Sequence, residues 1–155
     1  MPPIQHIINS GDFGTEIVIE TERAVIRSVT ESDIPLYQAL FADADVMAKY
    51  ATGKPKITDE EKTAIAKRVQ GWVDRWRTTP TDAEGKNYDP YNGMAVFEKA
   101  TGEFIGHVII GRSDVEGEAD TAISEVAYLL HKKYWRNEIL GVKGFGAEII
   151  QATIE

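Results

Sequence analysis

The chain contains no cysteine, and this absence excludes several kinds of chemistry at once. Without a thiol there can be no disulfide framework, no thiol nucleophile and no thiolate zinc site. No two of the three histidines have the spacing of a zinc site. The sequence also lacks a G-x-S-x-G nucleophile elbow and a P-loop. We therefore expect no metal centre and none of these nucleophile or nucleotide motifs.

Long apolar stretches are missing as well. No run approaches the roughly 20 apolar residues that a membrane-spanning helix needs. The N-terminal residues, MPPIQHIINSGDFGTE, contain neither the basic region nor the apolar region of a secretory signal. Together with the lack of cysteine, these absences favour a cytoplasmic protein with no membrane partner.

Basic residues are fewer than acidic ones, 17 against 25, so the formal net charge is -8. This balance argues against general nucleic-acid binding, which needs a basic surface. An acidic surface suits a cationic substrate such as an amine, although mild acidity also simply keeps proteins soluble. The length of 155 residues and the hydrophobic content of 43% are typical of one globular domain with its own core.

Hydrophobic periodicity and turn residues divide the chain into elements. Residues 1–15 are expected to be a flexible lead-in, and residues 16–155 a single domain. The sequence predicts strands over 16–20, 24–29, 93–99, 104–112 and 122–130, helices over 34–41, 58–77 and from Val142 onward, and loops over 53–57, 78–92 and 113–120. This order indicates an α+β fold with a mostly antiparallel sheet.

Two of these elements have strong local signals. The long helix begins with a capping box, because Thr58 is followed three residues later by Glu61. The strands over 93–99 and 104–112 flank a tight turn and predict an antiparallel hairpin. The residues expected in the core are Ala64, Ile65, Val69, Trp72, Val73 and Trp76 of the helix, and Met94, Val96, Ile105 and one face of Val108–Ile110 of the hairpin.

The most informative stretch runs from Glu125 to Glu155. An apolar strand leads through a basic, aromatic turn to Gly144 and Gly146, at the start of a helix. Such a loop binds phosphate, because it offers unpaired backbone N–H groups and the helix N-terminus adds a partial positive charge. Glycine is needed where a Cβ would block the close approach. The sequence therefore predicts a phosphate-binding loop ahead of the last helix.

Three local patterns, in order and at matching spacing, resemble one known family. They are TERAVIR over 21–27, KATGEFIG over 99–106, and EVAYLLH over 125–131 followed by Tyr134-Trp135. With the element order, they resemble the GNAT superfamily of acyl-CoA N-acyltransferases, in particular its RimJ/RimL-like branch. The resemblance implies a GNAT-like twisted sheet flanked by helices, with acetyl-CoA as the acyl donor.

The resemblance leaves two alignments of the phosphate loop. If the loop is Arg136–Gly141, it follows Trp135 directly, but Ile139 replaces the central glycine of the family pattern. If the loop is Val142–Ala147, both glycines match, at the cost of an insertion after Trp135. We prefer the second alignment, because its glycines stand directly before the predicted helix.

The resemblance also implies roles for individual residues. The backbone of Tyr128–Leu130 would pair with the pantetheine amides of acetyl-CoA, and the loop N–H groups would hold the pyrophosphate. Glu125, at the start of the central strand, is the candidate catalytic base. Apart from the resemblance, His107 and His131 stand at isolated strand positions, and we interpret them as structural residues. The predicted cofactor-binding residues are Tyr128, Leu129, Leu130, Arg136, Gly141, Lys143, Gly144, Phe145, Gly146 and Ala147.

The family normally continues beyond the last helix with a strand, a helix and a terminal hairpin, which have no counterpart in this sequence. We therefore expect a truncated domain that is weakly active alone, and self-association into a homo-oligomer to cover the open sheet edge. Two functions stay open. One is transfer of an acetyl group from acetyl-CoA to a primary amine of a protein N-terminus or a small molecule. The alternative is a non-catalytic domain that binds a partner or itself.

Overall fold

A computed structural model gives the fold and describes residues 4–11, 14–48, 50, 52–77, 92–112, 124–135 and 144–154. Its strands are β1 (Gln5–Gly11), β2 (Gly14–Glu20), β3 (Ala24–Ser28), β4 (Asn92–Glu98), β5 (Phe104–Arg112) and β6 (Ser124–Leu130). Its helices are α1 (Ile34–Ala42), α2 (Ala44–Met47), α3 (Asp59–Arg77) and α4 (Gly146–Ile154), with 3-10 turns η1 (Glu31–Asp33) and η2 (Lys132–Tyr134).

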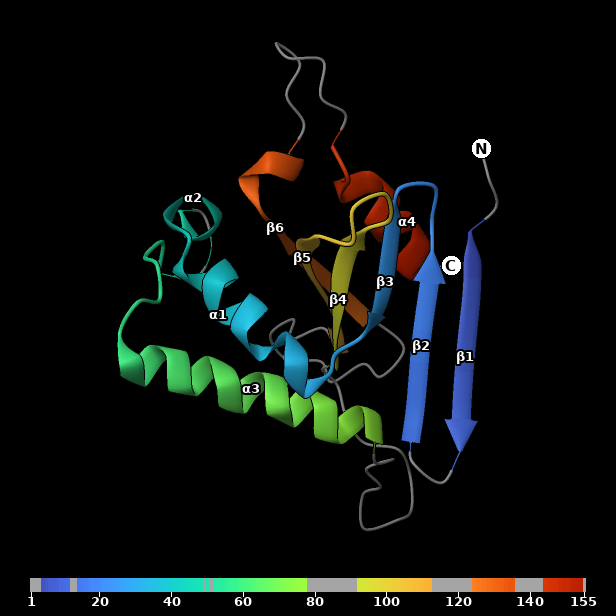
Figure 1. Cartoon of the computed structure of the whole chain (residues 1–155), viewed down its shortest axis with the longest axis horizontal. Helices are drawn as coiled ribbons and strands as arrows, with labels where there is room; N and C mark the ends of the chain where they lie inside the picture. Colours follow the sequence, from blue (N-terminus) through green and yellow to red (C-terminus); the bar gives the residue numbers. More distant parts are fainter. Residues whose placement is uncertain are drawn as a thin grey trace.

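Within the described residues, six strands form one antiparallel sheet in the order of the sequence, from β1 to β6 (Figure 1). Strand β1 lies at one edge and β6 at the other. Helices lie on both sides of the sheet (Figure 1). The predicted α+β class, with a mostly antiparallel sheet flanked by helices, is confirmed.

The N-terminal segment differs from the prediction. The sequence predicts a flexible lead-in over 1–15, but Gln5–Gly11 pairs with β2 along its whole length, from Gln5↔Glu20 to Gly11↔Gly14. That prediction is wrong for β1. The segment QHIINSG lacks the alternation of a half-buried strand, and its conformation depends on pairing with β2 rather than on local propensity.

The sheet separates two hydrophobic cores. Helices α1 and α3 cover one face and α4 covers the other (Figure 1). Side chains along β4 alternate between them, as the pleat of a strand requires. Met94 and Val96 belong to the core that contains Ile149 of α4. Ala95 and Phe97 belong to the core on the side of α1 and α3.

The hairpin prediction is confirmed. Strands β4 and β5 pair antiparallel, with Met94 opposite Val108. Met94, Val96, Ile105 and Val108 are each exposed by 1% or less. The hairpin therefore lies inside the sheet, between β3 and β6, and places its core residues as the alternation predicts.

The start of α3 is also confirmed, with one error in its buried face. The Glu61 N–H donates to Thr58 Oγ1 at 3.1 Å, and the Thr58 N–H donates to Glu61 Oε1 at 3.3 Å, which completes the capping box. Of the residues predicted to be buried, Ala64 is exposed. It directly precedes the buried Ile65, so it lies about 100° away around the helix and off the core-facing stripe.

Helix α4 begins at Gly146 rather than at Val142, because Gly144 and Phe145 precede the helix. Phe145 is buried, and its N–H donates to the Tyr134 carbonyl oxygen at 3.4 Å. The loop predicted over 113–120 lies outside the described residues, and so does the loop over 78–92 except for Asn92, which is part of β4.

Candidate functional site

Strand β6 forms an open edge of the sheet, because within the described residues it pairs with β5 alone. The His131 N–H donates to the Ile105 carbonyl oxygen at 2.9 Å, and every second residue of an antiparallel ladder bonds its partner in this way. The backbone groups of Leu129 therefore face β5. Those of Tyr128 and Leu130 face the open edge.

The two edge-facing residues differ in what they offer. The Leu130 carbonyl oxygen accepts a hydrogen bond from Trp135 Nε1 at 2.8 Å, which uses it at the end of the strand. Tyr128 presents an N–H and a carbonyl to the edge, and its side chain is 46% exposed. An extended chain that carries amides can pair with this edge as an added strand would.

The open edge lies beside the N-terminus of α4. A Cβ placed on Gly146 would come within 2.8 Å of the Tyr128 hydroxyl oxygen, so the Tyr128 ring lies against the first residue of the helix. The N–H groups of the first turn have no partner inside the helix and carry a partial positive charge. Ala147 in that turn is exposed. The structure therefore places an amide-pairing edge and an anion-attracting helix start next to each other.

Arg23 holds the start of α4 in place. Its Nε donates to Glu148 Oε1 at 3.0 Å and its Nη2 donates to the Gly144 carbonyl oxygen at 2.8 Å. Its guanidinium also lies 4.0 Å from the centroid of the Phe145 ring. The Thr21 hydroxyl donates to the other oxygen of Glu148. The turn between β2 and β3 thus fixes both the loop and the first turn of the helix.

The Glu148 carboxylate is an anchor in this network. Partial burial acts to raise its pKa, but the hydrogen bonds from Thr21 and Arg23 and the charge of Arg23 outweigh burial, so its pKa lies below the ordinary value. Glu148 is therefore ionised at neutral pH and cannot donate a proton there. Its effect on the site is to orient the helix N-terminus.

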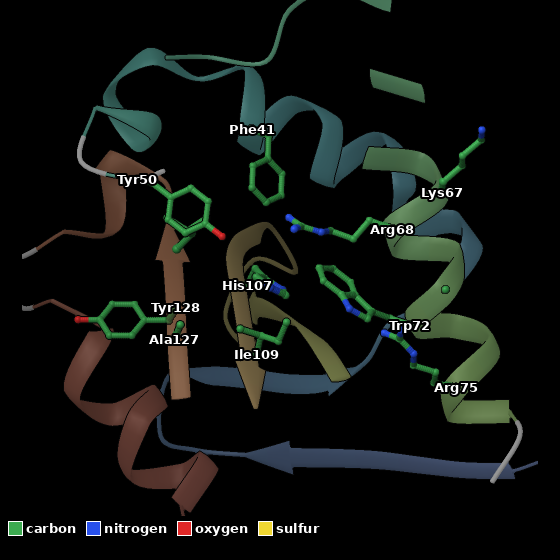
Figure 2. Close-up of a pocket in the computed structure, with 12 residues that line it drawn as sticks. Phe41, Tyr50, Lys67, Arg68, Trp72, Arg75, His107, Ile109, Ala127 and Tyr128 are labelled. Carbon is green, nitrogen blue, oxygen red and sulfur yellow. The ribbon is translucent and has the colours of Figure 1, made fainter. Parts of the chain in front are cut away.

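A cavity of about 530 Å³ adjoins the open edge (Figure 2). It lies between α3, the end of α1, and strands β5 and β6. Strand β6 forms both the open edge and part of the cavity wall. A molecule in the cavity therefore lies close to an extended ligand that is paired with this edge. The lining residues are Phe41, Tyr50, Lys67, Arg68, Gly71, Trp72, Arg75, His107, Ile109, Ala127, Tyr128 and Leu129.

Two buried polar side chains support the cavity. The Tyr37 hydroxyl oxygen lies 2.6 Å from His107 Nδ1 and donates to the Met94 carbonyl oxygen at 3.2 Å. The His107 ring stacks on Trp72, with centroids 4.9 Å apart. Burial lowers the pKa of His107 to about 3, so the imidazole is neutral at physiological pH. A base with so low a pKa accepts protons poorly, which supports the interpretation of His107 as a structural residue.

The predicted site residues fall into three groups. The backbone groups of Tyr128 and Leu130 face the open edge, and both Tyr128 and Leu129 line the cavity. Gly144, Phe145, Gly146 and Ala147 surround the start of α4. Glu125 lies in β6, opposite Gly111 in the register, and its side chain is not among those described. Arg136, Gly141 and Lys143 lie outside the described residues.

Some residues of the site were not predicted from the sequence. Thr21 and Arg23 belong to the TERAVIR pattern, but no role follows from the pattern itself. What identifies them in the structure is that the Thr21 hydroxyl and the Arg23 guanidinium both donate to the Glu148 carboxylate. Arg68 gave no signal beyond its place on α3, one helical turn before Trp72.

Two negative findings concern the part of the chain that the structure describes. No helix there combines the length and the apolar character of a membrane span. No cluster of three or more histidine and carboxylate side chains in those same residues is placed to bind a metal ion.

Comparison with known proteins decides the family. The sequence model described as "Acetyltransferase (GNAT) domain" matches residues 23–155. This chain belongs to the GNAT acetyltransferase family. The matched region begins at Arg23, the residue that bonds to Glu148 at the start of α4, and it includes the whole of α4.

Solved structures agree with the GNAT fold. The chain is similar to a GNAT-family acetyltransferase from Bacillus anthracis, with a TM-score of 0.55, 21% identity, and coverage of 88% of this chain and 63% of the other. It is also similar to a protein from Vibrio cholerae assigned as a ribosomal-protein-serine acetyltransferase, with a TM-score of 0.54, 16% identity, and coverage of 88% and 64%. The GNAT chain described here thus spans less than two thirds of the length of either structure.

Proposed function

We propose that this GNAT-family chain transfers an acetyl group from acetyl-CoA to a primary amine, in the cytoplasm. The acceptor is the N-terminus of a protein or a small amine, as in the RimJ/RimL-like branch that the sequence patterns resemble. One observation carries the proposal: an open strand edge at Tyr128 meets the N-terminus of α4 at Gly146, beside a cavity of about 530 Å³.

The edge and the helix start suit the two ends of acetyl-CoA. The backbone groups of Tyr128 and the N–H of Leu130 pair with the pantetheine amides. The loop and first turn from Gly144 to Ala147 receive the pyrophosphate, with Arg136, Gly141 and Lys143 as further contacts. The Leu129 backbone faces β5, so its part is to form the cavity wall on the acceptor side.

The chemistry then needs a base and an oxyanion site. Glu125 takes the proton of the amine as the nitrogen bonds to the thioester carbonyl carbon. Edge-facing N–H groups of β6 stabilise the oxyanion that forms. The carbon–sulfur bond breaks, and the sulfur leaves as a thiolate that takes up a proton from water or from a side chain. The neutral His107 is too weak a base to replace Glu125.

A substitution that changes the backbone tests whether the open edge at Tyr128 binds acetyl-CoA. Tyr128→Pro removes the N–H that faces the open edge and leaves the hydrogen bonds to β5 intact, a substitution that edge strands tolerate. Tyr128→Ala is the matched control, because it removes the ring and keeps the N–H. We expect Tyr128→Pro to weaken acetyl-CoA binding at least several-fold more than Tyr128→Ala, measured by titration calorimetry. Equal affinities of Tyr128→Pro and Tyr128→Ala for acetyl-CoA would refute the proposed acetyl-CoA site, and so would a failure of the unchanged chain to bind acetyl-CoA.

The same edge gives the chain a way to self-associate. An unpaired strand edge is a template for a strand of another copy. We propose that homo-oligomers form through β6 and that acetyl-CoA competes with them. Sedimentation velocity with and without acetyl-CoA tests this, and an oligomer that acetyl-CoA leaves unchanged would contradict it.

A further inference from the structure

The charged residues among the described lining of the cavity have one sign. Lys67, Arg68 and Arg75, all from α3, line it, and no aspartate or glutamate appears among its described lining residues. The chain as a whole has a net charge of -8, so this cavity is locally opposite to the average surface. A basic cavity in an acidic protein attracts anionic groups and disfavours polycations.

Of the three basic side chains, Arg68 extends into the cavity. Figure 2 shows it reaching from α3 towards Tyr50, below Phe41, whereas Lys67 extends away. Arg68 itself is exposed, and its positive charge contributes less than burial does to the lowered pKa of His107. Arg68 is therefore a solvent-accessible group whose side chain extends across the cavity (Figure 2).

The surroundings leave Arg68 available for a ligand. Ion pairs between described residues include Arg23 with Glu148, Arg27 with Asp33, Arg77 with Glu31, Lys99 with Glu20, Lys132 with Asp45 and Lys133 with Glu103. None of them uses Arg68. Phe41, Tyr50 and Trp72 line the same cavity and give it aromatic walls.

We propose that Arg68 binds an acidic group of the acceptor, so that the acceptor is an amine that also carries a carboxylate or a phosphate. The proposal rests on the proposed acetyl transfer, whose acceptor it defines. The guanidinium receives either group through paired N–H donors. With the acid at Arg68, the amine lies towards Ala127–Leu129 of β6, where the cavity meets the open edge.

This assignment reverses the expectation from composition. Net charge favours a cationic acceptor, because it averages over the whole surface. The acceptor meets only the cavity, whose lining is basic among the described residues. A polyamine would bring a second positive charge towards Arg68, which costs binding energy instead of adding to it.

The test compares matched acceptors with the whole chain and acetyl-CoA at constant ionic strength. The acceptors are an amino acid, its carboxamide, the aminoalkyl phosphate and the unsubstituted alkylamine of the same length. Hydrogen bonds to charged groups predict that kcat/KM for an acid-bearing acceptor exceeds that for the carboxamide by roughly 10-fold or more. The larger of the carboxylate and phosphate preferences identifies the natural acidic group.

Variants then assign the preference to Arg68. Arg68→Gln should remove the preference, measured as the ratio of kcat/KM for the acid-bearing acceptor to kcat/KM for the carboxamide, whereas Arg68→Lys should keep part of it. Lys62→Gln is the control, because it removes the same charge from α3 at a residue that does not line the cavity. Equal use of acid and carboxamide by the unchanged chain, or weaker acetyl-CoA binding in Arg68→Gln, would overturn the proposal.

Failure of the acetyl transfer itself is distinguishable. If no amine is acetylated, the proposed function fails, and equilibrium binding of the same four compounds still decides the role of Arg68. Preferential binding of the acid-bearing compounds that Arg68→Gln abolishes supports the inference. Equal binding of all four compounds to the unchanged chain and to Arg68→Gln overturns it.

Discussion

A Cβ atom on Gly106 would lie 2.0 Å from the carbonyl oxygen of Leu129, in the neighbouring strand. The absence of a side chain at Gly106 therefore allows β5 and β6 to pair where the open edge and the cavity wall meet. Gly106 is the last residue of the KATGEFIG pattern. The close approach of the Leu129 carbonyl oxygen explains why this position of the pattern is a glycine.

We predict that Gly106→Ala destabilises the fold by about 1–3 kcal/mol, because the obstructing atom is backbone and cannot turn aside. It should also displace β6 and weaken acetyl-CoA binding. Gly71→Ala is the control with the opposite sign: a Cβ there meets nothing within 4 Å, and alanine should stabilise α3 by up to about 1 kcal/mol. Urea unfolding of both proteins checks the pair, and an unchanged stability of Gly106→Ala would contradict the predicted clash.

The hairpin core gives a second prediction. Val96 and Ile105 are both fully buried between the sheet and α4. Truncating either to alanine should cost about 1–4 kcal/mol, through lost burial and the cavity that remains. Ile57→Ala is the control, because Ile57 is 62% exposed and its truncation should change stability by less than about 0.5 kcal/mol. Equal melting temperatures for the buried and exposed variants would show that the core is assigned wrongly.

Elements with local signals were predictable. The capping box at Thr58 and Glu61 sets the start of α3 through contacts three residues apart. The hairpin needs only a tight turn between two alternating strands. Gly144 and Gly146 likewise mark a helix start, and α4 begins at Gly146. In each case the residues that determine the structure are neighbours in the sequence.

Features that depend on distant residues were not predictable. The Arg23–Glu148 contact joins residues 125 positions apart, so neither residue alone indicates it. β1 exists because β2 pairs with it, although its own sequence is weakly strand-like. The basic lining around Arg68 is hidden in the sequence by an overall acidic composition, because net charge does not state where charges gather.

The Arg23–Glu148 contact predicts how acid affects stability. Hydrogen bonds hold the pKa of Glu148 in the folded chain below the ordinary value of 4.5, which applies to the unfolded chain. The stability that ionised Glu148 adds is therefore fully present above pH 4.5, and it is lost as the pH falls through the lower pKa of the folded chain. Glu148→Gln should be less stable than the unchanged chain at pH 7, and the difference should shrink in strong acid. The control is Glu60→Gln, an exposed carboxylate in the first turn of α3. A difference that stays constant from pH 7 to pH 3 would contradict this role.

The helix start predicts an effect of a single N–H group. Ala147 is exposed in the first turn of α4, where proline fits the helix and removes one backbone donor. Ala147→Pro should weaken acetyl-CoA binding several-fold with little change in stability, whereas Ala147→Ser keeps the donor and should bind normally. Because the donor is proposed to face the pyrophosphate, the loss should be smaller for pantetheine compounds without it. A uniform loss for both kinds of compound would place the pyrophosphate elsewhere.

His107 predicts a second, separate pH effect. Burial lowers its pKa from 6.5 to about 3, so between these values the unfolded chain binds a proton that the folded chain does not. The contribution of the neutral imidazole is fully present above pH 6.5 and is lost progressively as pH falls towards 3. Each pH unit inside this window costs up to about 1.4 kcal/mol. The window opens at a higher pH than that of Glu148, so the two effects separate between pH 6.5 and 4.5.

Two variants distinguish the proton from the hydrogen bond. His107→Gln removes the titrating group, so the free energy of unfolding should fall less between pH 6.5 and 4.5 than it does in the unchanged chain. Tyr37→Phe keeps the buried imidazole and removes the hydroxyl group beside Nδ1. It should lower stability by about 1–3 kcal/mol at every pH and keep the slope. Urea titrations at several pH values measure both quantities. If His107→Gln and the unchanged chain have the same slope, His107 is not the group that limits stability in mild acid.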